Sequence, residues 1–396
     1  MKKYILLIVL VFCVNMGFAQ RYRAESIEEG LQKGPDKAIS LTIKYSNKYI
    51  PDISKLSLFT NIEELTIQSA SDFPIEIVKL PNLQELILED SKKTYALPKE
   101  IAKLTKLHYL KIDSVSSISE ELFEITSMKT LHLSGNFNKI SKSIGKLTIL
   151  ESLYLESKKG FILPSEIQNL QKLQYFNLKN PDALFTKSIY RLSNLWTLNF
   201  KSKKPQNISD SLSYLKNLIN LRIDAPIKSL PNKIGDLSLL THLTLLNCSI
   251  NDLPASMQKL SRLQELFIVN SSLPKMPSII FLIPRLENIM LDGNQIEKIE
   301  EDWNKLLSLK SFSASNNPIK FLPAHLPPKL GSLSLSNTLI TTLPYNWHSG
   351  KRTQYFLDYI EAYNAPISQE EQTKIKETTH IKVLLGKKEL IYDYNR

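Results

Sequence analysis

Histidine and cysteine are the residues best suited to chemistry in this chain of 396 residues, which contains six histidines and two cysteines. Three of the histidines, His108, His132 and His242, fall at exposed strand positions, and their spacing matches no metal-ligand set. The patterns GxGxxG, GxxxxGK(S/T), HExxH, GxSxG and paired CxxC are absent. Cys248 falls at a turn, where a buried thiol is a structural residue. We therefore expect no catalytic residue, no metal site, no cofactor and no enzymatic activity.

Large aromatic, apolar and cationic residues recur instead at a near-constant interval, where they suit the binding of a partner. One region combines tyrosines with a tryptophan, and a second places four apolar residues in three consecutive repeats. The candidate partner-binding residues are Tyr109, His132, Tyr154, Tyr175, Trp196, Arg222, Leu246, Phe267, Val269 and Met290. Two other readings stay open, in which the tyrosines are ordinary sheet residues and the apolar group lies beneath a loop or at a dimer contact.

Lysines just after the expected strands form a third feature, the lysine rim. Its members are Lys92, Lys93, Lys158, Lys159, Lys201, Lys203 and Lys204. Along one edge they would attract phosphate or carboxylate groups of an envelope polysaccharide. Solvated lysines on exposed turns explain the pattern equally well. Aromatic and basic residues are not interleaved as nucleic-acid grooves require, so we expect no nucleic-acid partner.

The interval arises from an apolar pattern, LxxLxL, that recurs at spacings of 21 to 24 residues. Its thirteen copies begin at Ile62, Leu83, Leu107, Met128, Leu150, Leu173, Leu195, Leu218, Leu240, Leu263, Leu286, Leu309 and Leu330. Looser copies at 38–43 and 357–362 extend the series in both directions. Within each copy, the fourth and sixth positions alternate with exposed ones, which predicts a short strand with one buried face.

A second pattern, LPxxIxxL, follows most of the strands, for example at 230–237 and 253–260. Proline at the start of a turn and apolar residues three apart predict a short helical segment that returns the chain. One unit cannot bury its own leucines, so units must stack, and each buried Leu or Ile contributes about 1.5–3 kcal/mol. Stacking implies parallel strands about 4.8 Å apart, with the third, fifth and seventh positions of each repeat exposed on a concave face.

The combined pattern, LxxLxLxxNxLxxLPxxIxxL, resembles the leucine-rich repeat of exported bacterial proteins. The resemblance implies an α/β fold, a leucine-rich repeat solenoid with a curved parallel sheet on the concave face, short helices on the convex face and a cap at each end. It also implies a ladder of asparagines at the ninth position, which Asn136, Asn294 and Asn317 keep and for which Cys248 is an accepted substitute. The positions that depart from it are Ala70, Ser91, Lys158, Pro181 and Lys203. We therefore expect irregular curvature in the N-terminal half.

The two ends of the chain predict an export signal and two caps. Residues 1–19 have the features of a signal peptide, because Lys2 and Lys3 precede an apolar run shorter than the roughly 20 residues of a membrane span. Residues 20–37 contain Ser26 and Glu29 at capping-box spacing and predict an N-terminal capping helix. Residues 38–345 would form the solenoid, with about 13 to 15 repeats. Residues 346–396, with an expected helix at 368–377 and a hairpin around 386–388, would form the C-terminal cap.

Composition bounds the partner only loosely, because a net charge of +11 permits an anionic partner without requiring one. Export without a membrane span in the mature chain predicts a periplasmic, cell-surface or secreted protein. The resemblance implies an interaction scaffold. We therefore expect a non-enzymatic exported protein that binds another protein through the concave face. The alternative is an envelope polysaccharide binder that uses a tyrosine platform and the lysine rim.

Overall fold

The computed structural model describes residues 21–46, 49–91, 93–348, 357–378 and 381–387, so the expected signal peptide at 1–19 lies outside the described residues. The chain divides into two compact units, Met1–Leu173 and Gln174–Arg396, each of which is described by itself. In both units, short strands alternate along the chain with 3₁₀-helical segments. This is the alternation that the LxxLxL and LPxxIxxL patterns predict.

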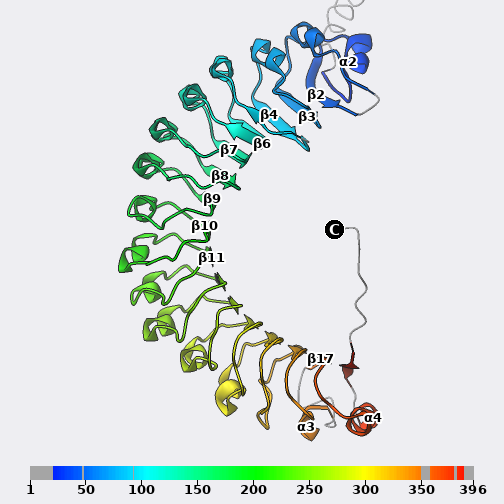
Figure 1. The fold of residues 1–396 in the computed structure, drawn as a ribbon, viewed down its shortest axis with the longest axis vertical. Helices are drawn as coiled ribbons and strands as arrows, with labels where there is room; N and C mark the ends of the chain where they lie inside the picture. Colours follow the sequence, from blue (N-terminus) through cyan, green and yellow to red (C-terminus); the bar gives the residue numbers. More distant parts are fainter. Residues whose placement is uncertain (1–20, 47–48, 92, 349–356, 379–380, 388–396) are drawn as a thin grey trace, which may run out of the picture. The chain divides into compact units, whose positions relative to one another are not determined.

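The first unit is a parallel sheet whose strands line one face, while the helical segments lie on the opposite face (Figure 1). Its strands are β1 (Tyr22–Ala24), β2 (Ala38–Lys44), β3 (Glu64–Gln68), β4 (Glu85–Glu89), β5 (Tyr95–Ala96), β6 (Tyr109–Ser117), β7 (Thr130–Gly135) and β8 (Ser152–Ser157). Its 3₁₀ segments are η1 (Ile53–Leu58), η2 (Ile75–Lys79), η3 (Lys99–Lys103), η4 (Glu120–Glu124), η5 (Lys142–Lys146) and η6 (Ser165–Asn169).

Strand register explains how the repeat builds the core of this unit. Leu86 of β4 lies beside Leu65 of β3 and Leu110 of β6, and all three side chains are buried. The register shifts between Ile112 and Val115, where β6 pairs with β7. The strand register is therefore interrupted here, and irregular curvature of the N-terminal half stays a prediction.

The second unit repeats the same arrangement, with strands on its concave face and helical segments on its convex face (Figure 1). Its strands are β9 (Tyr175–Lys179), β10 (Thr197–Lys201), β11 (Asn220–Asp224), β12 (His242–Leu246), β13 (Glu265–Val269), β14 (Asn288–Met290), β15 (Ser311–Ser313), β16 (Ser332–Ser334), β17 (Tyr359–Tyr363) and β18 (Lys382–Gly386). Its helical segments are η7 (Ile189–Arg191), η8 (Asp210–Tyr214), η9 (Ile234–Asp236), η10 (Ala255–Lys259), η11 (Ser278–Leu282), η12 (Glu301–Lys305), α3 (Tyr345–His348) and α4 (Gln369–Thr378).

Buried asparagines tie successive turns together in the second unit. The Asn294 side-chain amide donates to the carbonyl oxygens of Ile268 and Leu291 at 2.7 and 2.8 Å. Its Oδ1 accepts the backbone N–H groups of Ser271 and Leu273, both at 3.1 Å. The amide also donates to the Asp292 carbonyl at 3.3 Å, so one side chain bonds five backbone groups of the turns.

Of the three asparagines predicted to form the ladder at the ninth position, Asn294 and Asn317 do so and Asn136 does not. Asn317 is buried and donates to Leu291 and Ala314 at 2.8 and 3.0 Å. The prediction for Asn136 is wrong, because Asn136 is only half-buried and Phe137 is the buried residue of that turn. The chain is offset by one residue at this repeat, so the amide does not reach the ladder position.

Serines replace the ladder asparagine where lysine stands at the ninth position. Ser202, one residue before Lys203, is buried and donates to the Ala183 carbonyl at 2.8 Å. Its oxygen also accepts the Lys204 N–H at 3.0 Å. Ser157 is likewise buried and donates to a turn carbonyl. In these repeats a serine at the eighth position bonds the turn backbone in place of the asparagine, and the lysine at the ninth position is exposed to solvent.

A helix stands at the start of the first unit, and the second unit ends on a further strand. Helix α2 (Ile27–Lys33) has Ser26 as its N-cap, whose hydroxyl accepts the Glu29 N–H at 3.1 Å. The Glu29 carboxylate accepts the Glu25 N–H, one residue earlier than a reciprocal capping box requires. At the other end, β18 pairs in parallel with β17. The second arm of the expected hairpin lies outside the described residues.

Candidate binding surface

The concave strand face is formed by the third, fifth and seventh positions of each repeat. Burial alternates along the strands, as in Glu64–Gln68 and Glu265–Val269, where half-buried and buried residues follow one another. This follows from the two-residue period of a strand with one face on the core. Each of the ten candidate partner-binding residues is described and lies on or beside this face.

In the first unit, the structure brings His132 and Tyr154 together but leaves Tyr109 apart. The His132 and Tyr154 rings lie 3.9 Å apart between centroids and are tilted by 39°. The Tyr154 hydroxyl donates to the Glu156 carboxylate. Tyr109 occupies a different row of the sheet, beside Thr130. The aromatic group of this unit is therefore a histidine–tyrosine pair, which sequence spacing alone had not distinguished.

Charged side chains on the neighbouring strands of the first unit are already paired. Lys111 Nζ lies 2.8 Å from Glu89 Oε2, and the Gln68 amide donates to Glu89 Oε1 at 3.0 Å. The hydrogen bond from Lys111, followed by that from Gln68, holds the pKa of Glu89 below its usual value, and the same contact raises the pKa of Lys111. This part of the face is polar and internally satisfied.

In the second unit, Tyr175 and Trp196 form an exposed edge-to-face pair. Their ring centroids lie 6.1 Å apart with an interplanar angle of 77°, within the range that favours aromatic contact. Tyr175 is 46% exposed and Trp196 is 40% exposed. Trp196, which stands at the second position of its repeat, is therefore accessible as well.

Arg222 is exposed on β11 beside Thr244 of β12. Two residues further along, Asp224 is nearly buried, and its carboxylate lies 2.8 Å from Lys201 Nζ and accepts the Asn247 amide at 2.6 Å. Asp224 is therefore neutralised within the chain. Arg222, by contrast, extends its guanidinium group from a surface that is otherwise polar.

Leu246, Phe267, Val269 and Met290, which we call the apolar patch, are brought together as the sequence predicts. Leu246 of β12 lies directly beside Val269 of β13, and Phe267 lies beside Met290 of β14. All four side chains are half-buried. They meet because equal repeat positions stack in register. The result is a contiguous apolar surface on three neighbouring strands.

The lysine rim is partly neutralised by the chain itself. Lys201 pairs with Asp224 as above, and Lys204 Nζ lies 3.4 Å from Asp182 Oδ1. Lys92 lies outside the described residues. The remaining members are exposed, with Lys93, Lys158 and Lys159 in the first unit and Lys203 in the second.

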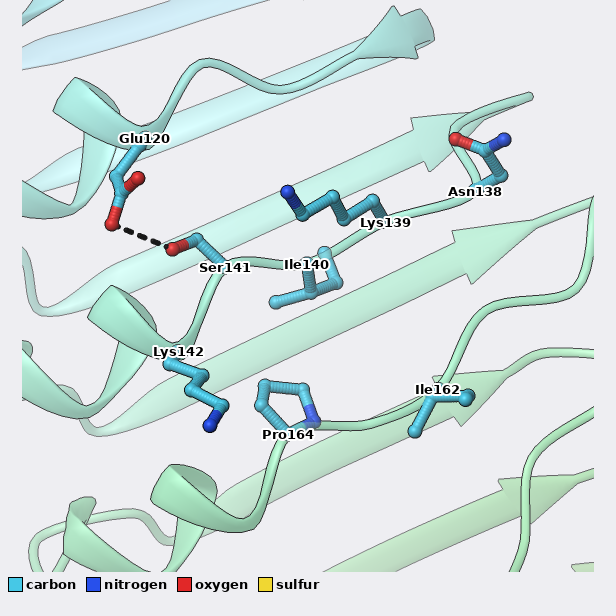
Figure 2. Close-up of a pocket in the computed structure, with 8 residues that line it drawn as sticks. All are labelled: Glu120, Asn138, Lys139, Ile140, Ser141, Lys142, Ile162 and Pro164. Atoms are coloured by element: carbon cyan, nitrogen blue, oxygen red, sulfur yellow. Dashed lines mark hydrogen bonds between the residues drawn. The ribbon is translucent and has the colours of Figure 1, made fainter.

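A pocket that the sequence did not predict lies beside the helical segments of the first unit (Figure 2). Its volume is about 540 Å³. Its lining comes from three consecutive repeats, with Ile140, Ile162 and Pro164 as apolar members beside two lysines. Glu120 at its edge accepts a hydrogen bond from Ser141 at 3.0 Å. The one sequence signal for it is Ile162, an apolar residue in a loop, which is 89% exposed.

Reactive and metal-binding groups are not gathered anywhere in the part of the chain that the structure describes. Cys248 is buried, and burial raises the pKa of its thiol to about 11. Its sulfur donates to the Leu246 carbonyl at 3.4 Å. The described residues contain no group of three or more His, Cys, Asp or Glu side chains that could hold a metal ion. They also contain no helix with the length and apolarity to cross a bilayer.

Comparisons with known proteins place the fold. No family model matches the chain, and no curated protein matches it. A leucine-rich repeat protein of Leptospira interrogans matches with a TM-score of 0.73 and 25% identity, over 91% of this chain and 99% of that one. An internalin of Listeria monocytogenes matches with a TM-score of 0.58 and 20% identity, over 70% and 82%. The plant peptide hormone receptor RGFR1, in complex with RGF2, matches with a TM-score of 0.54 and 17% identity, over 92% and 73%.

The parallel strands, the 3₁₀ segments opposite them and these structural likenesses agree with one another. The same sequence repeat forms the strands of the sheet and places the four residues of the apolar patch side by side. The chain therefore has the leucine-rich repeat fold, and bacterial proteins of that fold are among its structural neighbours.

Proposed function

We propose that this protein is a non-enzymatic, exported binding protein that recognises another protein through its concave strand face. The observation that carries the proposal is the apolar patch on β12, β13 and β14. Core packing fixes the buried fourth and sixth positions of each repeat but places no demand on the fifth and seventh. Apolar residues at these free positions on neighbouring strands are typical of a surface that a partner covers.

The composition of the patch fits protein recognition. Phe267 is a large side chain with few rotatable bonds, so it loses little conformational entropy when a partner contacts it, and the flexible Met290 side chain can adapt to the shape of the partner. The structural likeness to RGFR1, whose structure contains RGF2, supports a binding role for this fold, although fold alone does not identify a partner. Export rests on residues 1–19, and the periplasm, the cell surface and the medium are the compartments it allows.

Polysaccharide recognition is the second candidate function, favoured by the exposed Tyr175 and Trp196 rings. Exposed aromatic rings can stack against sugar rings. The lysine rim adds less support than the sequence indicated, since Lys201 and Lys204 already face Asp224 and Asp182. A polyanion would have to compete with these carboxylates.

The test is affinity capture of envelope and extracellular proteins on immobilised residues 20–396. The variant carries Phe267→Asp and Met290→Asp, which place two charges in the apolar patch. The matched control carries Leu282→Asp and Leu307→Asp, which add the same charges at exposed apolar positions, 59% and 64% exposed, on the convex side of the same unit. We expect the patch variant to bind the captured protein about 100-fold more weakly, because an unpaired charge would be buried. Equal capture by all three proteins would contradict the proposal.

A further inference from the structure

A row of polar side chains crosses three neighbouring strands of the second unit. Asn177 of β9, Asn199 of β10 and Arg222 of β11 occupy the fifth position of their repeats and lie side by side in register. Asn177 and Asn199 are half-buried, and Arg222 is exposed. We call these three residues the polar row. It crosses two strand spacings, or about 10 Å.

The polar row has hydrogen-bonding groups that the fold does not use. Among the described residues, neither Asn199 nor Arg222 forms a side-chain hydrogen bond, and Arg222 has no carboxylate within ion-pair distance. Asn177 Oδ1 is buried and accepts no hydrogen bond from the described part of the chain. The Asn177 amide is therefore not fixed, and rotation about its last torsion can turn its oxygen or its N–H groups outward. Two amides and one guanidinium group are thus available to a ligand.

The charge around the polar row is mainly positive. The third, fifth and seventh positions of β9, β10 and β11 carry three cationic residues, Lys179, Lys201 and Arg222, and one acidic residue, Asp224. Asp224 Oδ2 lies 2.8 Å from Lys201 Nζ, and Asp224 Oδ1 accepts the Asn247 amide at 2.6 Å. Its carboxylate is therefore occupied. A guanidinium group binds a carboxylate through two parallel hydrogen bonds, so Arg222 suits an acidic ligand.

The exposed pair of Tyr175 and Trp196 stands at one end of the polar row. Tyr175 precedes Asn177 by two residues on β9. The backbone carbonyl of Trp196 accepts the Asn220 N–H at 2.9 Å, which holds this residue beside β11. Tyr175 and Arg222 are two strand spacings and two residues apart, which is about 12 Å across the sheet. This distance is longer than one sugar ring, so a ligand that contacts both is an oligomer.

We propose that the polar row and the Tyr175–Trp196 pair bind an acidic carbohydrate, an oligosaccharide that contains a uronic acid. The aromatic rings stack on one sugar, the asparagine amides exchange hydrogen bonds with hydroxyl groups, and Arg222 binds the carboxylate of another sugar. A protein partner suits this site less well, because the centre of a protein interface is depleted of charged residues and the polar row has no apolar side chain.

This inference develops the second candidate function proposed above, since it names the class of polysaccharide and the residues that recognise it. It does not depend on protein recognition through the apolar patch. The two sites share no residue, because the polar row lies on β9, β10 and β11 and the apolar patch lies on β12, β13 and β14.

The test is calorimetric titration of residues 20–396 with uronic acid oligomers of about four sugars, prepared from polygalacturonate, alginate and hyaluronate. Methyl esters of the same oligomers keep the sugar rings and most hydroxyl groups but carry no charge. A tetraglutamate peptide carries carboxylates without sugars. We expect at least one oligomer to bind. Its methyl ester and the peptide should bind at least about 10-fold more weakly, because each lacks a group that the site recognises.

Three variants are titrated with the oligomer that binds. Arg222→Gln should weaken binding about 10- to 100-fold through the loss of charge-assisted hydrogen bonds, and it should bind the methyl ester as the wild type does. Trp196→Ala should weaken binding of the acid and of the ester about 10-fold. The matched control, Arg262→Gln, removes a charge from an exposed position between η10 and β13 and should leave binding unchanged.

Failure of every oligomer to bind, or equal losses for Arg222→Gln and Arg262→Gln, would overturn the inference. Equal binding of an acid and its methyl ester would also overturn it. Tighter binding of tetraglutamate than of every oligomer would assign Arg222 to a protein partner instead. A variant with Phe267→Ser and Met290→Ser changes no charge and should bind the oligomer as the wild type does, so loss of binding there would contradict a separate site. None of these failures alters the capture result expected for the apolar patch.

Discussion

Replacing Asn294 by alanine should destabilise the second unit strongly, although Asn294 contacts no partner surface. The Asn294 side chain is 6% exposed and bonds five backbone groups. Alanine would leave the N–H groups of Ser271 and Leu273 buried without an acceptor. An unsatisfied buried N–H costs about 1–3 kcal/mol, so the two together cost about 2–6 kcal/mol.

The three carbonyl groups add less to this loss than the N–H groups. The Leu291 oxygen still accepts the Asn317 amide at 2.8 Å, so it keeps a partner after the substitution. A carbonyl has two lone pairs and tolerates partial loss better than an N–H group does. We therefore place the total loss in the free energy of unfolding at about 4 kcal/mol.

The assay is equilibrium urea unfolding followed by tryptophan fluorescence, in which Trp303, fully buried in η12 of the same repeat, reports the change. The matched control is Asn288→Ala on β14, where the side-chain amide donates only to the Glu265 carboxylate at 3.1 Å near the surface. Its expected loss is within about 1 kcal/mol. Equal losses for Asn294→Ala and Asn288→Ala would refute the reasoning that the ladder amide satisfies buried backbone groups.

Three further predictions concern other parts of the chain. Asn136→Ala should lower the free energy of unfolding, measured by urea denaturation and far-UV circular dichroism, by less than about 1 kcal/mol, because Asn136 is half-buried. A loss as large as that of Asn294→Ala would contradict the one-residue offset that buries Phe137 in place of Asn136. Cys248, with its pKa raised to about 11 by burial, should react with a thiol reagent at pH 8 only after unfolding, so rapid reaction of the native protein would show that the thiol is accessible. Glu89, whose pKa is held below its usual value of about 4.3 by Lys111 and Gln68, contributes stability that is present above that value and is lost as pH falls through the depressed pKa. Glu89→Gln should therefore reduce the loss of stability between pH 6 and pH 3, and an unchanged loss would exclude this contribution.

The strands could be predicted because the repeat combines two simple periods. Within LxxLxL, alternation buries the fourth and sixth positions, and the near-constant spacing forces equal positions of successive repeats side by side. This is why the four residues of the apolar patch, taken from three repeats, meet in the structure. The tyrosines did not gather in the same way, since Tyr109 stands at the third position and Tyr154 at the fifth, in different rows.

Local offsets were the main reason that other predictions failed. Gly135 adopts a φ of +151°, and a Cβ there would lie 2.2 Å from the Val115 carbonyl oxygen, so the chain shifts by one residue and Phe137 takes the buried place. A consensus pattern with fixed positions does not contain this shift. The pocket beside Ile162 was missed because loop conformation, which the repeat does not specify, shapes it.

Photocrosslinking from position 267 tests the central claim most directly. A photoreactive phenylalanine derivative replaces Phe267 in the apolar patch, and in a second protein it replaces Leu282, an exposed apolar residue on the convex side. Both proteins are irradiated with the protein fraction in which binding was detected. We expect a covalent adduct with another protein from position 267 and none from position 282. An adduct from position 282 alone would contradict recognition through the concave strand face.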